Sequence, residues 1–192
     1  MTIIELMVTL AVFGLLLMVA LPNANEWMTN VRVRSTAESI STGVNRARTE
    51  AVKRNALVTF WLVTQNNGVL DATCARSAAS DSYVVAMDDP SGKCNLAPSN
   101  TDAPRIISFR ASQTVNSRIV ISALDSGGVS ANAVTFNGYG QPVSGAAVTN
   151  ISTIDVTSTD SGARRLRIMI TTGGDMRMCD RDVGVTDPRR CL

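Results

Sequence analysis

Glu5 is the side chain in this sequence whose setting most clearly suggests chemistry. It is the only acidic or basic side chain among residues 1–22, and its neighbours are apolar or small up to Pro22. A lone carboxylate in an apolar environment is costly to bury, so such a group is usually paired or functional. A terminal ammonium, from the same chain or from a neighbouring chain, is the nearest candidate partner. The setting therefore predicts an ion pair at this end of the chain.

The cysteines offer a second kind of chemistry. None of the four forms a C-x-x-C pair, and the chain has no His, so a zinc site would need all four thiolates at an unusual spacing. Two disulfides in an oxidising compartment fit better. Four cysteines allow three pairings. We favour Cys74–Cys94 and Cys179–Cys191, because each pair closes a segment that carries turn residues and little strand pattern.

Arginines gather near the C-terminus and could neutralise phosphate groups. Those considered for nucleic-acid binding are Arg177, Arg181, Arg189 and Arg190. If Cys179 and Cys191 are joined, the last two would lie on an exposed loop, free to meet a partner subunit or phosphate. Nearby acids (Asp180, Asp182 and Asp187) dilute the positive charge, and aromatic stacking partners are lacking. Structural salt bridges are therefore the favoured role of these arginines.

No catalytic constellation is found in the sequence. The absence of His removes the commonest general base, and no G-x-S-x-G motif is present. The acid pairs Asp88-Asp89 and Asp180-Arg181-Asp182 lack the spacing of a calcium loop, and the Gly-rich turns lack a following G-K-[ST]. We therefore expect no enzyme activity, no cofactor and no metal.

The elements that would position these residues begin with a long helix. The apolar run of residues 1–22 is long enough to cross a hydrocarbon layer of about 30 Å, and neither a basic n-region nor an A-x-A site marks it as a signal peptide. Gly14 and Pro22 are weak points in a helix. Residues 23–54 form an amphipathic half whose apolar positions recur every three or four residues: Val33, Ala37, Ile40, Val44, Ala47 and Ala51. We predict one helix over residues 2–54, with Asn55 near its end.

From residue 55 to residue 192 the pattern changes to short β-strands separated by turns rich in Gly, Asn and Asp. Many short strands with such turns favour antiparallel sheets. The fold class is therefore α+β, a long helix packed on a sandwich-like β domain. The predicted strands are Ala56–Val63, Ser82–Met87, Arg105–Arg110, Arg118–Ser122, Ala133–Asn137, Ile151–Thr157, Leu166–Thr171 and Asp175–Cys179.

Three stretches of the sequence resemble one family. Thr2-Ile3-Ile4-Glu5-Leu6, followed by an apolar helix and Pro22, resembles the N-terminus of a mature type IV pilin or pseudopilin. The stretch from Asn45 to Arg54 resembles the ARxEAVRR segment of H-type pseudopilins and of FimT- and FimU-type minor pilins, the GspH/FimT family. The TFNGYG element at residues 135–140 and the final hairpin, residues 165–179, resemble later elements of the same family. Residues 71–101 resemble nothing that we can name.

The resemblance implies a structural role without catalysis. Met1 would be the processed N-terminus, cut by a prepilin peptidase and methylated on its amine, and Glu5, Gly14 and Pro22 would act in assembly, the last two by letting the helix unwind. The chain would be a minor pilin or pseudopilin of a type IV pilus or type II secretion pseudopilus, near the tip. Its partners would be other pilin subunits, and it would cross the bacterial inner membrane once before assembly, with its globular domain in the periplasm.

The resemblance also supplies the alternative, a DNA-binding minor pilin in natural transformation. Some FimT-type pilins bind DNA through an Arg-bearing C-terminal tail with a GRxR pattern. Here the tail reads Thr186-Asp187-Pro188-Arg189-Arg190-Cys191 and lacks that pattern. DNA is therefore a possible partner but not the favoured one.

Overall fold

A single long helix dominates the fold. The computed structural model describes residues 2–112, 118–144, 148–160 and 162–191, with the backbone alone at residues 17 and 19–25. Helix α1 (Ile3–Arg54) begins after Thr2 and ends at Asn55, which adopts the left-handed conformation (φ 48°). The observed bounds agree with the helix predicted over residues 2–54. The helix passes through Gly14 and Pro22 without interruption, so their role in unwinding remains a prediction.

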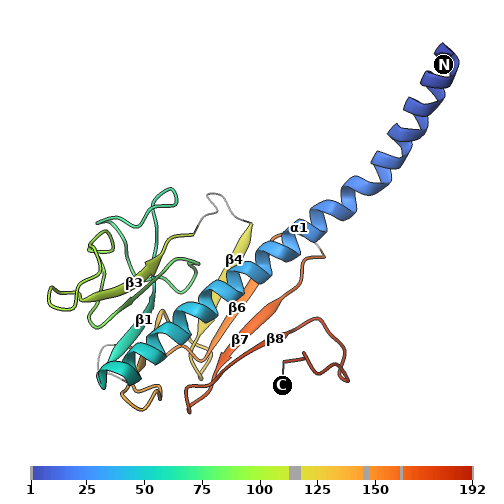
Figure 1. Ribbon diagram of the computed structural model, residues 1–192. Coiled ribbons are helices and arrows are strands. Elements are labelled where there is room, and N and C mark those ends of the chain that lie inside the picture. Colours follow the sequence, from blue (N-terminus) through green and yellow to red (C-terminus); the bar gives the residue numbers. More distant parts are fainter. Residues whose placement is uncertain (1, 113–117, 145–147, 161, 192) are drawn as a thin grey trace.

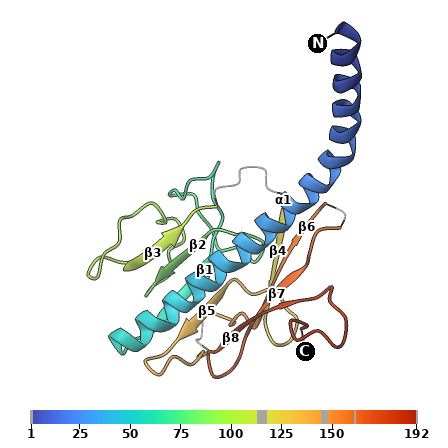
Figure 2. The same cartoon turned by 45° about the vertical axis from the view of Figure 1, so that its right-hand side comes forward.

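The two halves of α1 have different surroundings. The N-terminal half projects away from the rest of the molecule, while the C-terminal half lies along the β-sheets (Figures 1 and 2). All six positions of the predicted apolar stripe are fully buried against the sheets: Val33, Ala37, Ile40, Val44, Ala47 and Ala51. Within the part of the chain that the structure describes, no helix meets the length and hydropathy expected of a membrane span.

The strands form two antiparallel sheets of four. One sheet has the order β3-β2-β1-β5 and the other has the order β4-β6-β7-β8. Both sheets contact α1 and share one hydrophobic core with it. The predicted α+β class, a long helix on antiparallel sheets, is confirmed. The strands are β1 (Val58–Leu62), β2 (Tyr83–Ala86), β3 (Ile106–Arg110), β4 (Ile119–Leu124), β5 (Ala133–Phe136), β6 (Thr153–Ser158), β7 (Leu166–Ile170) and β8 (Met176–Asp180).

Each predicted strand differs from the observed one by one or two residues at one end or at both, and pairing explains two of these differences. β4 continues to Leu124, two residues past its predicted end, because Ala123 and Leu124 stay in register with β6. β6 begins at Thr153 and not at Ile151. The amide of Ile151 instead donates to the carbonyl oxygen of Ala133 in β5 (2.8 Å), so this residue links the two sheets.

Three strands of the first sheet, β1, β2 and β5, are buried on both faces. Phe60 and its alternate neighbours in β1 point into the core under α1, whereas Trp61 points to the opposite face. The two loops that flank β2 in the sequence cover that opposite face. They contribute Leu70 and the Cys74–Cys94 disulfide, whose sulfur atoms are 2.01 Å apart. Residues 71–101 thus supply β2 to the sheet and, on either side of β2, part of the outer cover of the sheet.

Arg48 of α1 ties two loops to the end of the helix. Its Nε donates to the carbonyl oxygen of Gly140 (3.2 Å), and its guanidinium lies 3.2 Å from the Asp175 carboxylate. The loops that it joins are those of the TFNGYG element and of the final hairpin. In this way two motifs that are far apart in the sequence meet at one point of the structure.

Candidate functional site

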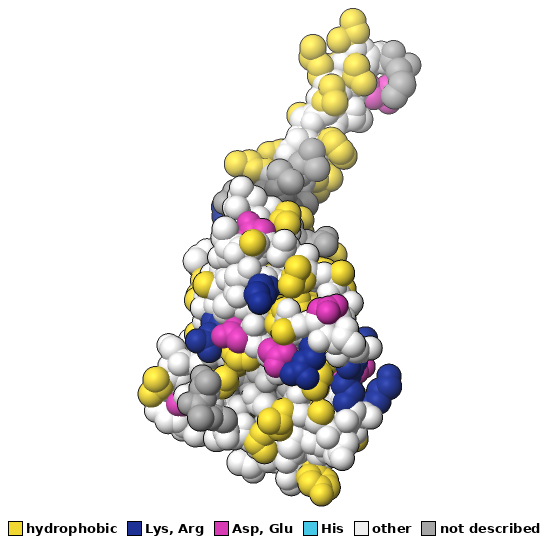
Figure 3. Space-filling view, turned by 90° about the vertical axis from the view of Figure 1, so that its left-hand side faces the viewer, with side chains coloured by type: hydrophobic (Ala, Val, Ile, Leu, Met, Phe, Trp, Pro, Cys, Tyr) yellow, Lys and Arg dark blue, Asp and Glu magenta, His cyan; other side chains and the backbone are white. Residues whose placement is uncertain are grey.

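The projecting half of α1 is the most unusual surface of the molecule. Its large apolar side chains are each between 51% and 79% exposed. A helix that is apolar on all sides is normally buried, and a continuous apolar surface of this extent marks an interaction site. Figure 3 shows these side chains at the top of the molecule, above a domain whose charges are mixed. They are Ile3, Ile4, Leu6, Met7, Val8, Leu10, Val12, Phe13, Leu15, Leu16 and Met18.

Glu5 lies at the beginning of this helix and helps to form its cap. The Thr2 amide donates to Oε2 of Glu5 (3.4 Å), and the two residues make a reciprocal capping box. The carboxylate also lies near the positive end of the helix dipole. Met1, which was predicted to be the processed and methylated residue, lies outside the described residues. The pairing of Glu5 with a terminal ammonium therefore remains a prediction.

The other two residues predicted to act in assembly lie farther along this half of the helix. Gly14 is surrounded by open space, since a Cβ atom added there would have no neighbour within 4 Å. The Pro22 side chain lies outside the described residues. Neither position is held by the globular domain in a way that the structure describes.

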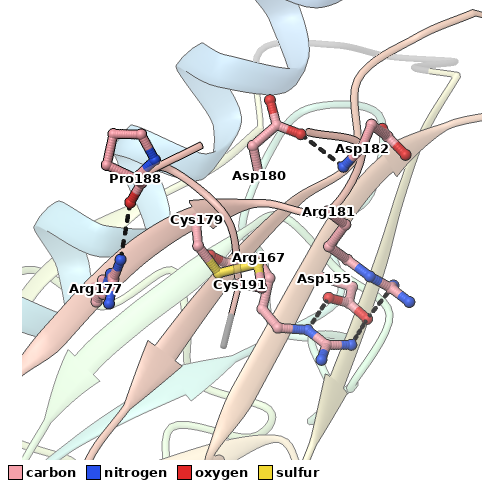
Figure 4. Close-up of a disulfide and its surroundings, with 9 residues drawn as sticks. All are labelled: Asp155, Arg167, Arg177, Cys179, Asp180, Arg181, Asp182, Pro188 and Cys191. Carbon is pink, nitrogen blue, oxygen red and sulfur yellow. Dashed lines mark hydrogen bonds and ion pairs between the residues drawn. A yellow bond between two sulfur atoms is a disulfide. The ribbon is translucent and has the colours of Figure 1, made fainter. Parts of the chain in front are cut away.

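The C-terminal arginines are mostly held by contacts within the chain (Figure 4). Arg177 donates to the carbonyl oxygen of Pro188 (3.0 Å), and Arg181 donates to Asp155 (2.9 Å). Arg189 makes a forked contact with Asp187, at 2.7 and 3.0 Å, which is a salt bridge of the kind favoured for these arginines. A phosphate-binding surface would instead present arginines whose guanidinium groups have no partner within the chain.

Asp155 is the centre of this arrangement, although no motif in the sequence marks it. It is 8% exposed and accepts two hydrogen bonds from Arg167 (2.7 and 2.8 Å) in addition to the one from Arg181. The bond to Asp155 raises the pKa of Arg167. Residues 155 and 167 face each other because of the register of β6 on β7, which no local sequence pattern reveals.

The chain end is fastened to the edge of β8. Cys179 and Cys191 form a disulfide with an S–S distance of 2.07 Å, and Cys74 and Cys94 form the other, so the pairs are those that the turn-rich segments favoured. Next to this bridge, the Asp180 amide donates to the carbonyl oxygen of Arg189 (2.7 Å). No group of metal-binding side chains occurs among the described residues.

The ion pair with Arg189 changes the pKa of the Asp187 carboxyl group. Hydrogen bonds from the Arg189 side chain and amide lower the pKa of Asp187 from 3.8 to about 2. Because this pKa is lower in the folded state, the pair stabilises the fold above about pH 4. That stabilisation is lost as the pH falls through about 2.

Carbon-13 NMR of the Asp187 carboxyl group can measure this pKa. We expect Arg189→Ala to return it toward its ordinary value. Arg190→Ala is the matched control and should leave it near 2, because the contact recorded between Arg190 and Asp187 is through the backbone. A wild-type value near 3.8 would contradict the ion pair.

Comparison with known proteins identifies the family. The family model described as type II transport protein GspH matches residues 36–174. No curated protein matches the chain. Two crystal structures of the type IV minor pilin FimU from Pseudomonas aeruginosa resemble it. One has a TM-score of 0.49 and 11% identity, covering 77% of this chain and 87% of FimU. The other has a TM-score of 0.42 and 14% identity, covering 76% and 90%.

Both TM-scores lie below 0.5, so the assignment rests on the family model, which spans well over half of the 192 residues. The stretch from Asn45 to Arg54 and the TFNGYG element at residues 135–140 lie within the matched range, and the final hairpin, residues 165–179, begins inside it. The chain belongs to the type II transport protein GspH family of pilin-like subunits.

Proposed function

We propose that this protein is a minor pilin or pseudopilin that assembles into a type IV pilus or a type II secretion pseudopilus, near the filament tip. The observation that carries the proposal is the projecting half of α1, whose apolar side chains have no cover from the chain's own domain. Membership of the GspH family supports a role as a subunit. Such a subunit works by packing and needs no catalytic group.

The proposed assembly follows from the chemistry of the projecting helix. A prepilin peptidase would cut before Met1 and methylate the new amine. Residues 1–22 would lie in the inner membrane, with the globular domain in the periplasm, and would then move into a core of like helices. There Glu5 would meet a neighbour's terminal ammonium, because leaving the carboxylate unpaired in an apolar core is costly. Gly14 and Pro22 would let the helix adjust as the subunits pack.

DNA binding in natural transformation is supported less well. Arg177, Arg181 and Arg189 are held by a carbonyl group or a carboxylate of the same chain. Recruiting them to phosphate would require breaking these contacts. The arginine contacts therefore favour a role in shaping the subunit surface.

Fractionation of filaments tests the proposed function. We expect the chain to be recovered with filaments sheared from cells, and to be absent from that fraction when the prepilin peptidase gene is deleted. A cytoplasmic marker protein controls for cell lysis. Absence of the chain from the filaments of wild-type cells, despite normal expression, would contradict the proposal.

A further inference from the structure

A groove lies beside α1, where the helix meets the last strands of the second sheet (Figure 1). It has a volume of about 430 Å³, within the range of small-molecule pockets, about 300–1,000 Å³. Trp27 and Val31 line it from α1, while Leu166 of β7 and Met178 of β8 line it from the sheet. Trp27 is 67% exposed, so most of this apolar side chain is open to a ligand.

The groove opens just beyond the apolar run of α1. Trp27 lies five residues after Pro22, or about 8 Å along the helix. If residues 1–22 cross the hydrocarbon layer, as proposed above, the headgroup layer extends about 5–8 Å beyond Pro22. Trp is enriched at this boundary because its ring is apolar and its N–H group is polar. The mouth of the groove therefore lies level with the lipid headgroups.

Arginines dominate the charged lining of the groove. Arg34, Arg164 and Arg189 line it together with one acid, Asp180. Asp180 is 4% exposed, and its carboxylate accepts a hydrogen bond from the amide of Asp182 (2.9 Å). This acid therefore presents little surface to a ligand, and the lining favours an anionic group.

Arg164 is the arginine best placed to bind that group. Arg34 and Arg189 are each bonded to an acid of the same chain. Within the described part of the chain, the Arg164 guanidinium has no hydrogen bond or ion pair with another residue. The main-chain amide of Arg164 donates to the Asn30 side chain (2.8 Å), which holds this residue beside α1. The guanidinium keeps all of its N–H donors for a phosphate.

We propose that the groove binds the phosphate headgroup of an anionic phospholipid. The proposal rests on the proposed function, because a subunit that waits in the inner membrane meets lipid before it assembles. Arg164 binds the phosphodiester oxygens, Trp27 contacts the glycerol, and the acyl chains follow the apolar surface of the projecting half of α1. A free phosphate ester carries similar charge but lacks the chains, so only the lipid uses both parts of this surface.

Quenching of Trp27 fluorescence by brominated lipids tests this site in the full chain. The protein is reconstituted into vesicles of phosphatidylcholine with a minor share of phosphatidylglycerol, and either one lipid or the other carries the bromine at the same mole fraction. The second tryptophan, Trp61, is 4% exposed and lies among core residues, so its emission is a constant background. We expect brominated phosphatidylglycerol to be enriched near Trp27 about fivefold, the effect of one arginine at an anionic surface.

Arg164→Ala should abolish this preference, whereas Arg164→Lys keeps the charge and should retain part of it. Arg32→Ala is the matched control, because Arg32 is an exposed arginine next to Val31 that does not line the groove. It should leave the preference unchanged. Equal loss of the preference in Arg164→Ala and Arg32→Ala would indicate a diffuse attraction to the membrane and would overturn the proposal.

Two further arms identify the occupant. Added glycerol phosphate, compared with sodium chloride at the same ionic strength, should leave the preference unchanged. If it removes the preference, the groove binds free phosphate esters and the lipid is the wrong occupant. Vesicles made wholly of brominated phosphatidylcholine separate this inference from the proposed function. Strong quenching there without a preference for phosphatidylglycerol would mean that the headgroup site alone is wrong. No quenching there would contradict the proposed place of residues 1–22 in the membrane as well.

Discussion

Replacing Glu5 with Ala is expected to leave the protein in the membrane but to lower its recovery in sheared filaments by at least tenfold. The reason is the proposed pairing of this carboxylate with the terminal ammonium of a neighbouring subunit. Removing one partner of a buried ion pair costs about 3–5 kcal/mol, and 1.4 kcal/mol already corresponds to a factor of ten. Immunoblotting of the membrane and filament fractions measures both quantities in one experiment.

The structure suggests a control that separates two roles of this residue. Glu5 also caps its own helix by accepting a hydrogen bond from the Thr2 amide. Glu5→Gln keeps an oxygen for that bond but removes the charge. If the ion pair governs assembly, the Gln variant should fail as the Ala variant does. Normal assembly of Glu5→Gln would show that the helix cap is what matters, and normal assembly of both variants would contradict any role for the carboxylate.

Replacing Gly174 with Ala is expected to lower the melting temperature by about 6–12 °C. Gly174 has a φ of +83°, where other residues are strained, and a Cβ atom at this position would collide with the carbonyl oxygen of Gly140. Backbone strain and overpacking each cost about 1–3 kcal/mol, or about 3 kcal/mol together. For a chain of this size, 1 kcal/mol corresponds to about 2–4 °C. Circular dichroism during heating provides the measurement.

Gly128→Ala is the matched control for this prediction. Gly128 has almost the same backbone angle, with a φ of +81°, but a Cβ atom there would have no neighbour within 4 Å. It should therefore show the cost of backbone strain alone, about 1 kcal/mol. Equal melting temperatures for the two variants would mean that the loops of Gly140 and Gly174 can move apart at little cost.

The helix and the strands were predictable because each has a periodic signal. The stripe from Val33 to Ala51 repeats with the period of a helix, and all eight runs of β-forming residues became strands. Turn residues marked most of the boundaries. Each strand nevertheless differs from its predicted bounds by one or two residues. The differences at Leu124 and at Ile151 depend on partners in other strands, so local sequence carries no signal for them.

The contacts of the surface were much less predictable. Asp155, Arg167 and Arg181 meet only because β6, β7 and the segment after β8 lie side by side. A groove beside α1 combines Trp27 of the helix with Leu166 of β7 and Met178 of β8, and nothing in the sequence links these residues. Apart from β2, residues 71–101 lack a repeating pattern, because the Cys74–Cys94 disulfide and local turns hold them.

The packing of α1 has a mechanical consequence. The buried stripe from Val33 to Ala51 extends about 27 Å along the helix and contacts both sheets. The projecting half of α1 instead exposes its apolar side chains between Ile3 and Met18. A pull on the N-terminal segment is therefore directed along the stripe, so its contacts resist in shear and share the load. A pull on the segment that follows β8 is borne by the Cys179–Cys191 bridge, which joins that segment to the strand. The molecule should thus resist tension most strongly along the axis of its own helix, the direction in which a filament would stretch it.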